Sequence, residues 1–187
     1  MTSFNWLDLL MIVVMAATVF RGAVCGFVVE LFKILGTITA TIFALHFYVQ
    51  GGQKLNSFVA LPIPAAEIIS FVLIVALTLL IFKLIREGWL LILKTQAKAG
   101  FSQWAGGFIA IFRSFLVCGL LFFLVFLFGN ETLDTFAEKS VTGSYLRDLS
   151  PRVYKVTYQA LLSKFFPDEA LNKKAFKAVK KESASKK

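Results

Sequence analysis

The chain has 187 residues, a length typical of one domain, and 58% of them are hydrophobic while only 17% are charged. Its net charge of +9 does not indicate a nucleic-acid binder, because the basic residues are spread over predicted connections and concentrated at the C-terminal end. The apolar residues come in long blocks, a pattern typical of a chain whose solvent is lipid rather than water.

The first apolar block, residues 6–24, is close to the roughly 20 residues that a helix needs to cross a bilayer. Asp8 and Arg21 lie at its two ends, and Arg21 is expected to anchor in the headgroups. The second predicted span covers residues 27–49, and His46 near its far end is expected in the membrane interface.

The stretch between these two spans, residues 21–33, predicts a helical hairpin. Gly22 and Gly26 are four residues apart, which permits a tight turn or a close approach of helices. Glu30 and Lys33 follow at the start of the returning helix.

Residues 50–64 contain Gly and Pro and predict a loop, after which residues 65–82 form the third predicted span. Residues 84–103 are mixed in polarity and predict either an interfacial helix or an extension of the third span. The fourth predicted span, residues 104–128, carries Arg113 as its one charge.

A helix is predicted to start at Ser150, with Ser as N-cap and Pro at the first helical position. This amphipathic helix is expected either to lie on the membrane surface or to pack on the bundle. The positions expected to contact the membrane are Arg152, Tyr154, Lys155, Leu161, Leu162 and Phe165. The sequence thus predicts an all-α integral membrane protein: a four-span domain (1–130), a C-terminal amphipathic region (131–167) and a basic tail (168–187).

No catalytic motif or phosphate-binding loop is present, and Cys25 and Cys118 have no metal-ligand or disulfide spacing. We therefore expect no catalytic residue, no cofactor and no metal, and we do not expect an enzyme. Asp8 and Glu67 are predicted at the same face, where they are expected to be solvated rather than to form a catalytic pair.

Arg113 is the most informative charge, because an Arg inside a span costs about 2.5 to 3.5 kcal/mol on insertion scales. It is expected either to pair with Glu30, at a similar depth on the second span, or to extend to the headgroups.

The short connections predict the orientation, because basic residues favour the cytoplasmic side. The first and third connections hold Arg21, Lys33, Lys83, Arg86, Lys94 and Lys98, against Lys54 alone in the second. Both termini are therefore expected outside the cytoplasm.

The hairpin is similar to the pattern Gly-x-x-Arg-Gly-Phe-x-x-Glu-Leu, and the fourth span is similar to Asp-Arg-x-x-Gly-x-x-x-Gly-x-x-Arg-Gly. On these residues the chain resembles the colicin V production protein (CvpA) family of bacterial inner-membrane proteins. The matching or anchoring positions are Asp8, Arg21, Gly22, Gly26, Phe27, Glu30, Leu31, Gly36, Gly106 and Arg113. The departures are Cys25, Ser102, Gln103, Ala110 and Ser114.

The resemblance implies a non-enzymatic inner-membrane protein required for production or export of a colicin V-type toxin, or for envelope maintenance. A small channel or transporter is an alternative, with Thr37, Thr41, His46 and Arg113 as path-lining groups. A scaffold that recruits a partner through its C-terminal helix is another. The expected partners are the lipid bilayer and either a second copy or another membrane protein, with no nucleic acid and no small-molecule substrate.

Overall fold

The structure, a computed structural model, describes residues 5–59, 61–92, 99–128, 140 and 149–157. Every regular element in these ranges is an α-helix: α1 (Trp6–Cys25), α2 (Phe27–Phe58), α3 (Ile63–Ile92), α4 (Ala99–Leu127) and α7 (Leu149–Thr157). The first four are long and apolar enough to cross a membrane. The predicted all-α membrane protein with four spans is confirmed, whereas the division into domains remains a prediction.

The predicted loop over residues 50–64 is wrong for residues 50–58, which continue α2 to Phe58, and for residues 63 and 64, which begin α3. Gly51 and Gly52 do not make a turn. A Cβ atom at Gly51 would lie 2.1 Å from Oγ of Ser70, and one at Gly52 would lie 2.9 Å from Cα of Glu67. These glycines therefore let α2 and α3 pack closely near their connected ends.

The first part of the mixed segment, residues 84–92, is an extension of the third predicted span, because α3 continues to Ile92. Residues 93–98 lie outside the described ranges. The fourth span likewise starts earlier than predicted, at Ala99. Near the C-terminus, α7 begins at Leu149, one residue before the predicted cap, and the residues after Thr157 lie outside the described ranges.

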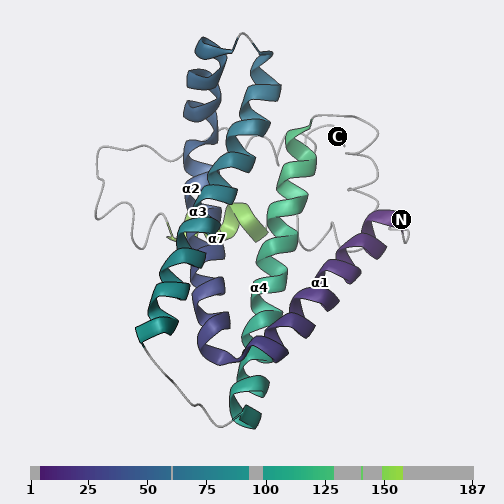
Figure 1. Cartoon of the computed structure of the whole chain (residues 1–187). Helices are drawn as coiled ribbons and strands as arrows, with labels where there is room; N and C mark the ends of the chain where they lie inside the picture. The colour runs from purple at the N-terminus through teal and green to yellow at the C-terminus, as the bar shows by residue number, and fades with distance from the viewer. Residues whose placement is uncertain (1–4, 60, 93–98, 129–139, 141–148, 158–187) are drawn as a thin grey trace.

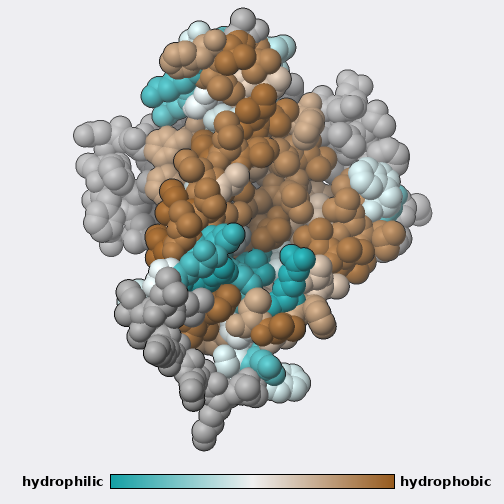
Figure 2. All heavy atoms as spheres, in the orientation of Figure 1, coloured by the Kyte–Doolittle hydropathy of each residue, from teal (hydrophilic) through white to brown (hydrophobic). Residues whose placement is uncertain are grey.

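The four long helices pack in the spatial order α3, α2, α4, α1, so that α2 and α4 are central (Figure 1). The short helix α7 packs against both central helices. The outer helix α3 has only 11% of its most apolar window buried, compared with 44% for α4. Figure 2 shows the result, a broad hydrophobic surface on one face of the molecule. Such a surface suits contact with lipid.

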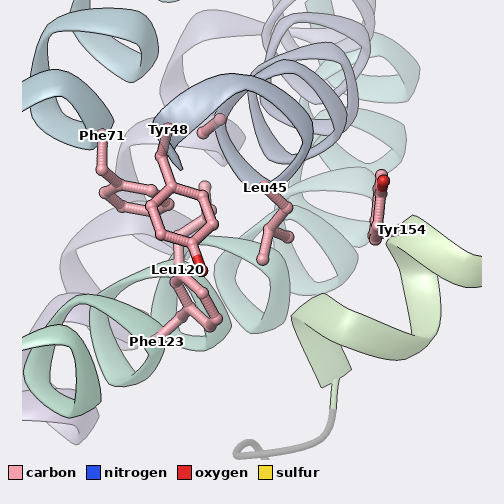
Figure 3. Close-up of a cluster of buried hydrophobic side chains, with 7 residues drawn as sticks. Leu45, Tyr48, Phe71, Leu120, Phe123 and Tyr154 are labelled. Atoms are coloured by element: carbon pink, nitrogen blue, oxygen red, sulfur yellow. The ribbon is translucent and has the colours of Figure 1, made fainter. Parts of the chain in front are cut away.

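One buried cluster of aromatic and aliphatic side chains joins four of these helices. The rings of Phe71 and Phe123 have centroids 5.4 Å apart, and Tyr48 packs edge-on against Phe123 at 5.9 Å. The labelled members in Figure 3 are Leu45, Tyr48, Phe71, Leu120, Phe123 and Tyr154, from α2, α3, α4 and α7. A second cluster, which includes Met11 and Phe122, holds α1 on α4.

Candidate functional site

A single residue, Gly26, joins α1 to α2. Its φ of 85° lies in a region that residues with a Cβ atom rarely adopt, so glycine is needed for the chain to reverse here. Its backbone N–H donates to the carbonyl oxygen of Gly22 at 3.2 Å and closes the last turn of α1. For Gly22 and Gly26 the sequence permitted either a tight turn or a close approach of helices. In the structure, Gly26 makes the turn.

Gly22 makes the close approach, to α4. A Cβ atom at Gly22 would lie 2.2 Å from Cβ of Ala110. A Cβ atom at Gly106 would in turn lie 2.8 Å from the carbonyl oxygen of Gly22 and 2.8 Å from the carbonyl carbon of Gly26. The backbone of the turn thus rests directly on the backbone of α4, as small residues allow in membrane helices.

Ser102 of α4 caps α2 from outside. The backbone N–H of Phe27, the first residue of α2, donates to Oγ of Ser102 at 3.0 Å. Glycine at the N-cap has no side chain to satisfy the first free N–H groups of the helix, so a hydroxyl from another helix does so. Ser102 stands where the family pattern has Asp, and both side chains can accept this bond.

One turn into α2, Glu30 is fully buried and binds two cations. Its Oε2 accepts a bond of 3.1 Å from Nζ of Lys33, and its Oε1 forms an ion pair with Nε of Arg113 on α4. The Arg113 side chain is 15% exposed, so it does not extend freely to the headgroups. The predicted pairing of Glu30 with Arg113 is confirmed.

At the other end of α1, Asp8 is buried rather than solvated. One carboxylate oxygen accepts the backbone N–H of Asn5 at 2.9 Å and stabilises the start of the helix. The other accepts the hydroxyl of Ser140 at 2.6 Å, across a sequence separation of 132 residues. Asp8 therefore joins Ser140, which follows α4 in the sequence, to the first helix.

His46 is buried among the helices, and α2 continues past it to Phe58. Its expected depth at the membrane interface remains a prediction. Its Nδ1 lies 2.8 Å from the hydroxyl of Tyr154 on α7. Tyr154 is fully buried in the aromatic cluster (Figure 3), so the described part of α7 packs on the bundle. The role of this helix at the membrane surface remains a prediction.

The remaining predicted site residues are spread over the molecule. Gly36 packs closely on Phe82 of α3, while Arg21 and Phe27 are exposed near the turn. Arg152 and Lys155 are exposed on α7. Three predicted positions lie outside the described residues: Leu161, Leu162 and Phe165. Within the described ranges, no three His, Cys, Asp or Glu side chains come together in a way that could hold a metal ion.

The turn, its close packing on α4 and the buried Glu30–Arg113 pair come from the two segments that resemble the family patterns. The family of colicin V production proteins matches residues 7–151 of the chain, which is most of its length. The chain belongs to the colicin V production protein family. Searches of curated proteins and of solved structures find no match.

For this family member, sequence reasoning missed three partners: Ser102 for the start of α2, Ser140 for Asp8, and Tyr154 for His46. Each joins residues from distant segments. The family pattern marks the position of Ser102, but only as a departure from Asp. No signal in the sequence marks the other two contacts.

Proposed function

We propose that the protein is a non-enzymatic, multi-pass protein of the bacterial inner membrane that is required for production or export of a colicin V-type toxin, or for envelope maintenance. Family membership supports this proposal. The basic residues of the first and third connections favour the cytoplasm for that side and the outside for both termini.

The observation that carries the proposal is that the four groups expected to line a path are each bound to another group of the same protein. Thr37 and Thr41 donate their hydroxyls to carbonyl oxygens of their own helix, each at 2.8 Å. His46 contacts Tyr154, and Arg113 pairs with Glu30. Groups that line a polar path need to be available to a permeating ion, so this arrangement favours an accessory or scaffold role over a channel.

A deletion strain complemented with plasmid-borne protein tests the proposal. We expect the deletion to lower secreted toxin and raise cell-retained toxin if export is the function, or to raise detergent sensitivity if envelope maintenance is. Wild-type protein should restore either defect, and Arg113→Gln should restore it less well. A deletion with neither defect would contradict the proposal.

A flux assay distinguishes the proposed accessory or scaffold role from the channel alternative. Purified protein in liposomes is expected to give no ion flux above that of empty liposomes. A flux that Arg113→Gln or His46→Ala changes would favour a channel instead. Crosslinking in native membranes then tests whether the protein contacts a second copy or another membrane protein.

A further inference from the structure

A groove of about 530 Å³ runs between α2, α3 and α4. It exists because α3 packs on α2 and makes little contact with α4, so α2 forms its floor. The volume is within the range of about 300 to 1,000 Å³ that is typical of ligand sites. The face in Figure 2 shows hydrophilic residues gathered in the lower part of a broad hydrophobic surface.

The lining of the groove is charged at one end and apolar at the other. Toward the N-terminal ends of α2 and α4 and the C-terminal end of α3 it holds four cations: Lys33, Lys83, Arg86 and Arg113. Toward the other end it holds apolar side chains alone, including Phe71, Val75, Leu120 and Leu124. A ligand complementary to this lining has an anionic head and a hydrocarbon tail.

The cations of the groove exceed the acids that neutralise them. Lys33 and Arg113 share Glu30, while Lys83 and Arg86 share Glu87. Four positive side chains therefore face two carboxylates within the described residues. Nε of Arg86 is buried and has no hydrogen-bond partner in the part of the chain that the structure describes. An anion with several acceptor oxygens would complement this end of the groove.

The length of the groove fits one leaflet of a membrane. Its lining on α3 runs from Phe71 to Arg86, a helical stretch of about 22 Å at the usual rise per residue. Half of a bilayer with its headgroups measures about 20 to 22 Å. Val72 and Leu79 line the groove and are also exposed, so the groove is open to the hydrocarbon region from the side.

We propose that this groove binds an anionic phospholipid, with the phosphate at Lys83 and Arg86 and one acyl chain along the apolar side chains of α3 and α4. Basic pockets between membrane helices bind lipid headgroups by the same chemistry. The lipid fills the space that the helices leave between them. The proposed role in toxin production does not require this lipid site.

Native mass spectrometry of the full-length protein in detergent, titrated with phosphatidylglycerol or phosphatidylcholine, tests the site. Phosphatidylglycerol is expected to bind with a defined stoichiometry and at least about tenfold more tightly than phosphatidylcholine. Arg86→Gln is expected to weaken phosphatidylglycerol binding about tenfold, because one charged hydrogen bond is lost. Lys54→Gln, an exposed cation at the opposite end of α2, should leave it unchanged.

A second pair of variants tests the acyl-chain part without touching a charge. Ala76→Trp places a large side chain in the groove, whereas Leu77→Trp places it on the neighbouring exposed position outside the groove. Only Ala76→Trp should lower phosphatidylglycerol binding. This pair decides the question if Arg86→Gln fails to fold.

Three outcomes would overturn the proposal. They are equal binding of the two lipids, equal effects of Ala76→Trp and Leu77→Trp, and displacement of phosphatidylglycerol by inorganic phosphate. Displacement would indicate a site for free phosphate in place of a lipid.

Discussion

The hydroxyl of Tyr154 lies 2.8 Å from Nδ1 of His46, and this contact joins residues 108 positions apart in the sequence. His46 is on a central helix, and Tyr154 is on the short helix that follows all four spans. Both side chains are buried. The contact therefore makes α7 part of the helical bundle rather than an appendage.

Tyr154→Phe is expected to destabilise the protein by about 1 to 3 kcal/mol, because it leaves a buried nitrogen of His46 without this partner. Tyr154→Ala should cost more, about 3 to 5 kcal/mol, because the ring is also lost from the aromatic cluster. Thermal unfolding in detergent measures both. Val156→Ala, at a position 65% exposed on the same helix, is the control and should change little.

Removal of Glu30 is expected to cost about 3 to 5 kcal/mol, because Arg113 then stays in the bundle without its acid. Removal of Arg113 is expected to cost less, because Glu30 keeps Lys33 as a partner. Glu30→Gln and Arg113→Gln should each lower the amount of protein in the membrane. Their effects should be strongly non-additive in a double-mutant cycle, since the two residues are in contact. Additive effects would show that the pair contributes no coupling energy.

The charge swap, Glu30→Arg with Arg113→Glu, is expected to restore only part of the loss. Lys33 lies one helical turn from Glu30 and binds it, so after the swap it would face a second cation. Adding Lys33→Gln to the swap should therefore increase the recovery, measured again as membrane accumulation. A swap as damaging as the single changes, with or without Lys33→Gln, would contradict this interpretation.

Two adjacent glycines of α4 give a matched test of the close packing at the turn. At Gly106 an added Cβ would meet backbone atoms at 2.8 Å, whereas at Gly107 the nearest atom is Cβ of Ala23 at 3.5 Å. Gly106→Ala is expected to destabilise the protein by about 1 to 3 kcal/mol through overpacking. Gly107→Ala should be neutral or slightly stabilising. Equal melting temperatures for the two variants would show that the turn can move away from α4.

Reporter fusions test the predicted orientation. An alkaline phosphatase fused after Lys187 is expected to be active, because the basic first and third connections favour the cytoplasm and so predict both termini outside it. The same enzyme inserted near Lys98 should be inactive. The reverse pattern would place both termini in the cytoplasm, and the groove cations would then lie at the outer leaflet.

The sequence by itself determined the class of the protein, the number of spans and the hairpin after the first span. Long apolar blocks predict spans reliably, because every backbone polar group in lipid must be satisfied within a helix. The pairing of Glu30 with Arg113 could also be predicted, since two opposite charges at similar depth in separate spans stabilise each other. The sequence did not determine whether Gly51 and Gly52 make a turn, because glycine serves turns and close packing equally well.

Only the tertiary structure decided which helices are neighbours, because an apolar helix surface fits lipid and another helix almost equally well. That choice placed α3 on α2 and away from α4, which left the groove with its four cations. It also brought Ser102 to the start of α2, Ser140 to Asp8 and Tyr154 to His46. Each of these contacts joins polar groups of segments that are distant in the sequence, and no local pattern of residues encodes such a contact.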